Sequence, residues 1–214
     1  MLRFKHKLRN MFTLRNHHKY KERNFNITEL DGISKKQIDD HLLLYSGYVN
    51  HVNLILEQVK ELVEMDFNEG YLVNELQRRF SFEFNGMKLH EYYFEQLETG
   101  KTELDKKGKL MNFIKEECGN FGGLLTKIKK AGLTRGIGWI VFYYNPENNK
   151  PVVSWVDSHH IGHTAGLPVL FVLDMWEHAY MIDYTSSEKK KYIDAVFKNM
   201  NWKVVEERFE RMSR

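Results

Sequence analysis

Apolar residues recur every three or four positions between residues 34 and 65. This spacing places one apolar stripe along a helix. The stripe consists of Ile38, Leu42, Tyr45, Val49, Val52, Leu56, Val59 and Val63. Ser34 stands just before the stripe and suits an N-cap, because its hydroxyl can accept a hydrogen bond from a backbone N–H of the first turn. A polar break at residues 66–70 follows, and the pattern then predicts a second helix from near Met87 to Leu97.

The second half of the chain has shorter periodic segments. Two helices are predicted from Leu110 to Ala131, and a last helix from Tyr192 to Phe209. Three apolar runs predict strands, at residues 136–144, 151–156 and 167–173. The expected fold class is α+β. An antiparallel helical hairpin, residues 25–103, precedes an α/β domain, residues 104–214, in which helices pack on a three-stranded antiparallel sheet.

The composition is that of a globular protein. Of the 214 residues, 42% are hydrophobic and 29% are charged. The longest apolar run is far shorter than the roughly 20 residues that a membrane helix needs, so no membrane span is expected. The single cysteine, Cys118, cannot form a disulfide within the chain, which favours a reducing compartment such as the cytoplasm. We expect Cys118 to act as a small buried hydrophobe rather than a reactive thiol.

Positive charge gathers at the N-terminus, although the formal net charge is only +3. The first 24 residues contain a single acid, Glu22, and eight basic residues: Arg3, Lys5, Lys7, Arg9, Arg15, Lys19, Lys21 and Arg23. We expect residues 1–24 to form a solvated, mobile tail. Contact with nucleic acid or an anionic surface, and a role as a transit peptide, are the alternatives.

Candidate chemistry first appears where the third predicted strand ends. The apolar run stops at Asp174, and Glu177 and His178 follow within one helical turn. An unpaired buried charge costs several kcal/mol, so such a group is normally hydrogen-bonded or bound to a metal. The spacing alone leaves two interpretations open. Asp174 and His178 bind a metal, or Asp174 caps a helix and His178 lies on the surface.

The string D-M-W-E-H-A-Y, which begins at Asp174, resembles the metal-binding motif of the iron/manganese superoxide dismutases. In that family the Asp and the His are two of four protein ligands to one redox metal, and the other two are histidines on upstream helices. The strings I-S-K-K-Q-I-D-D-H and F-N-G-M-K-L-H match those positions. The resemblance therefore implies metal ligands His41, His90, Asp174 and His178.

The resemblance also implies two catalytic residues, Tyr48 and His159. The family's Tyr stands eight residues after the first ligand, a spacing that needs an extra residue in the helix, such as a π-bulge. Here Tyr48 stands seven residues after His41, so we predict a regular helix that points both into one pocket. Most relatives use Gln to donate to the metal-bound solvent. Gly86 occupies one Gln position, so His159, at the other, is expected to be the donor.

Further residues are expected around the ligands. Trp139 and Trp176 match the family's tryptophans beside the metal. Glu177 is expected to meet His178 of the partner subunit, and Tyr45 to lie at the subunit interface. Lys189 is the cation nearest to the position of the family's funnel Arg. His160 and His163 stand in the same loop as His159, and the three could form a separate metal site, although a structural or surface role for His160 and His163 is favoured.

The implied function is dismutation of superoxide to dioxygen and hydrogen peroxide by one Fe or Mn ion that cycles between +3 and +2. Gly86 with His159 favours iron, by analogy with archaeal iron enzymes. Superoxide is the expected substrate, and a cytoplasmic homodimer, or a tetramer, is the expected form. No nucleic acid is expected except through the basic tail. Two alternatives are an inactive dismutase-like structural or RNA-associated protein, and a metal hydrolase built on the three-histidine loop.

Overall fold

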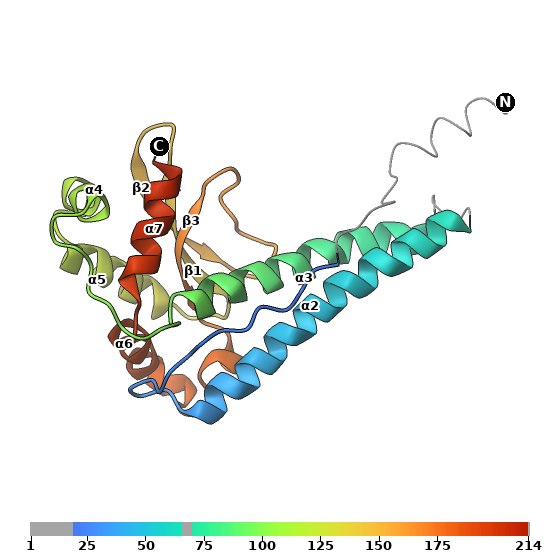
Figure 1. The fold of residues 1–214 in the computed structure, drawn as a ribbon, viewed down its shortest axis with the longest axis horizontal. Helices are drawn as coiled ribbons and strands as arrows, with labels where there is room; N and C mark the ends of the chain where they lie inside the picture. The colour runs from blue at the N-terminus through green and yellow to red at the C-terminus, as the bar shows by residue number, and fades with distance from the viewer. Residues whose placement is uncertain (1–18, 66–69, 214) are drawn as a thin grey trace.

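The computed structural model describes residues 19–65 and 70–213. Its first two helices, α2 (Lys35–Glu64) and α3 (Tyr71–Glu95), form an antiparallel hairpin that extends away from the rest of the molecule (Figure 1). The hydroxyl of Ser34 accepts from the backbone N–H of Gln37, which confirms the predicted N-cap.

Helix α3 begins at Tyr71, much earlier than the predicted start near Met87. The reason lies at the outer end of the hairpin, where a small second core forms. Val73 of α3 packs there against Ile55 and Val59 of α2, and all three are buried. These contacts stabilise the first turns of α3 through the burial of apolar surface, and they depend on residues of α2 that lie far away in the sequence.

The three predicted strands form one antiparallel sheet, which confirms the prediction (Figure 1). The order of the strands in the sheet is β2-β1-β3. They are β1 (Trp139–Asn145), β2 (Lys150–Val156) and β3 (Val169–Asp174). The central strand β1 is buried at six of its seven positions. Its first residue, Trp139, pairs with Asp174 in β3, so the register alone brings a tryptophan beside the carboxylate.

Helices cover this sheet. They are α4 (Lys109–Cys118), α5 (Phe121–Gly132), α6 (Lys189–Lys198) and α7 (Trp202–Met212). Helix α5 packs on β1, α4 on β2, and both α3 and α7 on β3. The prediction of one helix over residues 192–209 is wrong, because the helix is interrupted between the end of α6 and the start of α7. There the Asn199 amide donates to the Asp31 carbonyl, and the Asn201 N–H donates to the Gln96 carbonyl.

One hydrophobic core joins the inner half of the hairpin to the sheet. It includes Val49 of α2, Phe94 of α3 and Phe171 of β3, and Cys118 packs against it half-buried. The proposed division into units at residues 103 and 104 stays a prediction. No helix in the described ranges combines the length and the apolarity needed to cross a membrane.

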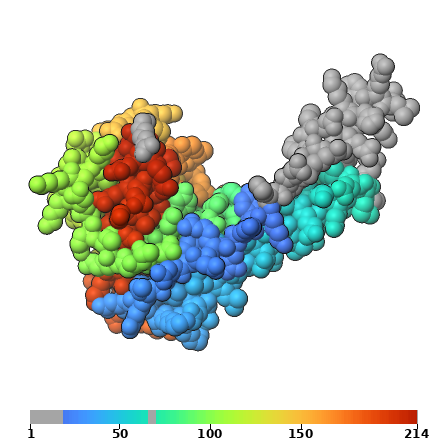
Figure 2. Space-filling view, viewed as in Figure 1, coloured from blue at the N-terminus to red at the C-terminus, as the bar shows by residue number. Residues whose placement is uncertain are grey.

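The segment before α2 lies along the hairpin (Figures 1 and 2). The Tyr20 N–H donates to Asn53 Oδ1 at 2.8 Å, and Asn53 Nδ2 donates back to the Tyr20 carbonyl at 2.9 Å. The Arg23 N–H donates to the hydroxyl of Tyr45 at 3.0 Å. The predicted mobile tail is therefore anchored at Tyr20 and Arg23, and its residues 1–18 lie outside the described part of the chain.

Candidate metal centre

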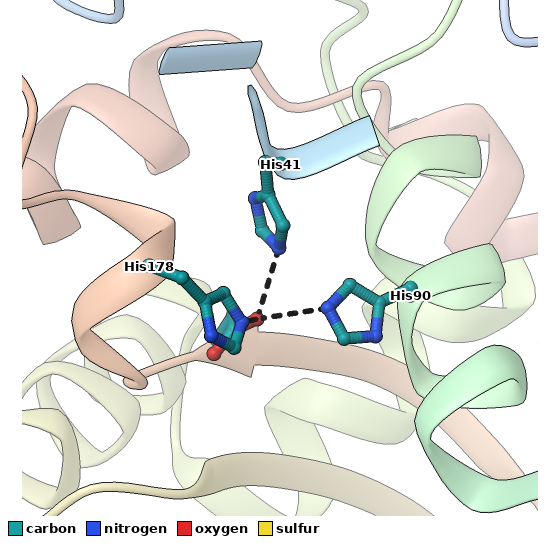
Figure 3. Close-up of side chains that lie close together, drawn as sticks. His41, His90 and His178 are labelled. Carbon is teal, nitrogen blue, oxygen red and sulfur yellow. Dashed lines mark hydrogen bonds and ion pairs between the residues drawn. The ribbon is translucent and has the colours of Figure 1, made fainter. Parts of the chain in front are cut away.

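Four side chains from four segments converge where the hairpin meets the sheet. His41 comes from α2, His90 from α3, Asp174 from the end of β3, and His178 from the short helix η1 (Glu177–Ala179). Figure 3 shows the three imidazoles pointing toward one another. One ligand atom from each of the four residues lies within 4.8 Å of the others. This grouping is the one that the sequence predicts.

Two hydrogen bonds from outside the histidine cluster hold Asp174 in place. Its carbonyl accepts from the Tyr192 hydroxyl at 2.8 Å, and its Oδ1 accepts from the Trp176 N–H at 2.8 Å. The other carboxylate oxygen, Oδ2, faces the imidazoles, at 3.2 Å from His41 Nε2, 3.2 Å from His178 Nε2 and 3.8 Å from His90 Nε2. The strand end thus presents one carboxylate oxygen to three ring nitrogens, and that oxygen is hydrogen-bonded to His178.

The backbone of α3 selects the tautomer of His90. Its Nδ1 lies 2.6 Å from the carbonyl of Gly86, one helical turn earlier. A carbonyl can only accept, so Nδ1 carries the ring proton and Nε2 presents a lone pair to the site. Such an outer partner is typical of a histidine that binds a metal.

Gln37 positions His178, and the sequence analysis missed it. Its side chain donates to the His178 carbonyl at 2.6 Å and accepts from the Ile182 N–H at 3.0 Å. These two bonds tie the segment around η1 to the first turn of α2. One sequence signal pointed to Gln37, since it stands four residues before His41 and thus on the same face of the helix.

The imidazole nitrogens of the site are short of hydrogen-bond partners. Within the described residues, His41 Nδ1, His41 Nε2 and His90 Nε2 are buried with no such partner. His41 Nε2 is close to the Asp174 carboxylate, but the pair lacks the directionality of a hydrogen bond. Buried polar atoms are normally satisfied, and leaving one without a partner costs about 1–3 kcal/mol. Atoms of this kind are what a bound cation would satisfy.

The protonation states suit a metal ion. Burial lowers the pKa of His41 and lowers the pKa of His90 well below its usual range, so both rings stay neutral. For Asp174, burial opposes ionisation, but interactions with His178 and His41 outweigh it and hold the pKa low. Neutral imidazoles with one ionised carboxylate form a nitrogen and oxygen donor set that iron and manganese accept. The residues present therefore fit such an ion.

Aromatic rings enclose the four side chains. The ring of Trp139 meets that of His90 edge-on at 5.1 Å, and Trp176 stacks on His178 at 5.9 Å. Phe94 lies 4.9 Å from His41. These walls keep water away from the ligands, which strengthens electrostatic interactions inside the site.

Tyr48 and His159 lie directly beside this group. Helix α2 is α-helical at every position from Lys35 to Glu64, which confirms the predicted absence of a bulge. The ring of Tyr48 lies 5.0 Å from that of His90, and its hydroxyl lies 2.6 Å from His159 Nε2. His159 Nδ1 accepts from the Trp139 indole N–H at 3.0 Å. Burial lowers the pKa of His159 to about 4 and raises the pKa of Tyr48.

Comparison with known proteins agrees with this geometry. Residues 106–208 match the family model for the C-terminal domain of iron/manganese superoxide dismutases. The iron superoxide dismutase of Aquifex aeolicus is 36% identical over 188 residues, which cover 85% of this chain and 86% of that protein. The counterpart from Saccharolobus solfataricus is 31% identical over 183 residues, 84% of this chain and 86% of the relative. The chain belongs to the iron/manganese superoxide dismutases.

Two residues expected at the subunit interface of this dismutase differ in exposure. Glu177 is exposed. Tyr45, by contrast, is 0% exposed, with its hydroxyl between the Arg23 N–H and Glu91 Oε1. Tyr45 is therefore enclosed by its own chain, which corrects the expectation of a subunit contact. The covering segment around Arg23 has no counterpart in the helical pattern from which the expectation came.

The other histidines of the dismutase's loop make structural contacts. His163 Nδ1 lies 3.1 Å from the Tyr143 hydroxyl, and its Nε2 lies 2.8 Å from the His159 carbonyl. His160 Nδ1 lies 3.3 Å from Ser158 Oγ. Lys189, the expected funnel cation, donates to the Gly136 carbonyl at 2.7 Å.

Proposed function

We propose that this protein converts superoxide to dioxygen and hydrogen peroxide, with one iron or manganese ion held by His41, His90, Asp174 and His178. The observation that carries the proposal is the cluster of four donor atoms within 4.8 Å, in which buried imidazole nitrogens lack hydrogen-bond partners among the described residues. The bound ion would supply one-electron redox chemistry between the +3 and +2 states. The relatives named iron superoxide dismutase support iron over manganese.

The chain itself supplies the ligand charge and the protons. Two superoxide ions and two protons give one dioxygen and one hydrogen peroxide, so each turnover needs proton delivery. Burial raises the pKa of Tyr48, which keeps its hydroxyl protonated at neutral pH beside the ligand His90. Asp174 stays ionised because His178 and His41 lower its pKa against the effect of burial. This single negative charge partly neutralises a cation in an otherwise neutral ligand set.

The two other readings have weaker support. An inactive, RNA-associated dismutase relative would not need the four donors, yet all four are present and converge. Its RNA contact would fall on the basic tail, residues 1–24, of which residues 1–18 lie outside the described part of the chain. A hydrolase built on His159, His160 and His163 would need a free ring nitrogen on each residue, but both ring nitrogens of His159 and both of His163 are in hydrogen bonds.

We also propose that two copies associate. Apolar side chains are exposed on α2 and just after η1, at Leu43 (73%), Met181 (49%) and Ile182 (42%). Gln37 joins these two segments, and Glu177 is exposed beside them. Sedimentation equilibrium of the Met181→Glu variant tests this, since a buried charge would shift a dimer toward monomer.

The single cysteine supports a cytoplasmic location, which cell fractionation tests.

The decisive experiment measures bound metal and superoxide dismutation on the same samples. Full-length protein is loaded with iron or with manganese, and metal per chain is determined by mass spectrometry. We expect one ion per chain and activity that follows it. His90→Ala should lose both, whereas the matched control His160→Ala should keep both. Intact protein that binds neither metal, or binds one without dismutation, contradicts the proposal.

A further inference from the structure

Gly86 of α3 packs directly against the ring of Tyr48. A Cβ atom at position 86 would lie 2.6 Å from Tyr48 Cδ1 and 2.8 Å from Cε1, distances that real Cβ contacts do not reach. The residue sits within helix α3 in ordinary helical backbone, so glycine is needed here for space rather than for an unusual conformation. The ring of Tyr48 fills the volume that a side chain at position 86 would occupy.

The regular helix α2 creates this close approach. Tyr48 stands seven residues after His41, so both side chains lie on the face that packs on α3. On α3, Gly86 stands one turn before His90, and its carbonyl accepts the ring proton of His90. The ring of Tyr48 therefore lies over the same turn of α3 that orients a proposed metal ligand.

Hydrogen-bond chemistry fixes the proton on His159. An indole N–H can only donate, so His159 Nδ1, 3.0 Å from Trp139 Nε1, must present a lone pair. The ring proton of the neutral imidazole is then on Nε2, which lies 2.6 Å from the Tyr48 hydroxyl. His159 donates this proton to the Tyr48 oxygen, and both of its ring nitrogens are engaged. The O–H of Tyr48 stays available to a different acceptor.

We propose that His159 is a positioning residue, and that Gly86 at the ring and His159 at the hydroxyl together hold Tyr48 so that its hydroxyl, not the imidazole, is the hydrogen donor to the metal pocket. This inference rests on the proposed function for its catalytic meaning. It changes the role expected from the sequence, in which His159 itself donates to the metal-bound solvent. A glutamine would behave differently, because after one bond to Tyr48 it keeps a second N–H.

The first test reads the proton on His159 without any activity measurement. Full-length, metal-free protein labelled with ¹⁵N-histidine is studied by NMR, since a paramagnetic ion would broaden the signals. We expect His159 as the Nε2–H tautomer, with a slowly exchanging imidazole proton. Tyr48→Phe should shift that signal or abolish it, because the acceptor is lost. An Nδ1–H tautomer, or an unchanged signal in Tyr48→Phe, overturns the inference.

The second test uses two glycines. Gly86→Ala should displace the Tyr48 ring and abolish the His159 signal. Gly47→Ala is the matched control, because an added Cβ at Gly47, next to Tyr48 on α2, meets no described atom within 4 Å. It should leave the signal unchanged. Near-ultraviolet circular dichroism checks that each variant is folded, and a folded Gly86→Ala protein with the wild-type signal overturns the inference.

Dismutation by iron-loaded variants then separates positioning from mere stability. Gly86→Ala should lower the rate, and should lower it no further when Tyr48→Phe is already present, because the hydroxyl it displaces is gone. Gly86→Ala should also lower the stability of the fold. This loss should be the same when Tyr48→Phe is present, since the phenylalanine ring still meets the new Cβ. Additive losses of rate overturn the inference. If the protein shows no dismutation at all, the NMR results still decide the inference, so its failure is distinct from that of the proposed function.

Discussion

Two groups of three histidines differ in how far apart they are in sequence and in what their nitrogens do. His159, His160 and His163 share one loop, yet each makes hydrogen bonds to neighbouring groups of the protein. His41, His90 and His178 come from three distant segments, and the first two carry buried ring nitrogens with no partner in the described chain. A metal site is thus marked by ring nitrogens that converge and lack hydrogen-bond partners. Closeness of histidines in the sequence is a poor guide to such a site.

The difference has an energetic side. Buried nitrogens without partners cost stability, whereas the loop histidines stabilise the loop through their bonds. The first group is therefore expected to depend on an ion and the second is not. Four measurements test this contrast.

The largest effect is expected from Asp174→Asn. The amide can still accept from the Trp176 N–H, but the negative charge at Oδ2 is lost, and only the three imidazoles remain to hold a cation. Metal affinity should fall more than about 100-fold, since ligands exceed the 10–100-fold typical of the groups that orient them. Competition with a chromophoric chelator measures it. Unchanged affinity would mean that the cluster is not the metal site.

Gln37→Ala should have the next largest effect. It removes both bonds that tie the His178 segment to α2, so metal affinity should fall about 10–100-fold. Stability should fall by about 1–3 kcal/mol because the backbone groups of His178 and Ile182 lose a partner. Lys36→Ala is the control. It breaks an exposed pair with Asp40 that is worth at most about 0.5 kcal/mol. Equal effects from both variants would contradict a positioning role for Gln37.

His163→Ala tests the other group. Loss of its contacts with the Tyr143 hydroxyl and the His159 carbonyl should lower the free energy of unfolding by about 1–3 kcal/mol, measured in urea. One metal per chain should remain. A folded variant that loses its metal would show that the two groups are not separate.

The smallest effect per residue is expected from mild acid. Burial lowers the pKa of His41, His90 and His159, the last to about 4, whereas in the unfolded chain a histidine has its ordinary pKa of about 6.5. The unfolded state then binds more protons than the folded state below that pH. The stability that these neutral imidazoles contribute is therefore fully present above pH 6.5 and is lost as the pH falls toward 4; for His159 the loss at pH 6 is about 0.8 kcal/mol. Urea unfolding of metal-free protein from pH 7.5 to 5 measures it, and a stability that rises on acidification would contradict it.

The sequence predicted local features and motif residues well. The Ser34 cap and the three strands carry local signals, and the four converging side chains follow from the resemblance of their motifs to those of a family. Features that depend on distant partners were missed or misassigned. The Asn199–Asn201 break depends on bonds to Asp31 and Gln96, and the burial of Tyr45 depends on Arg23. The engagement of both His159 nitrogens depends on Trp139 and Tyr48, which no local pattern reports.

The enclosure of the ligands has a consequence for how a metal would be acquired. His41, His90 and Asp174 are at most 1% exposed. Because three of the four ligands are buried, we expect an ion held there to leave, or be replaced, mainly when the hairpin parts from the sheet, and such openings are rare excursions from the native state. We expect exchange to follow the rate of these openings rather than the strength of the bonds. The metal found in a purified sample would then record which ion was abundant when the chain folded.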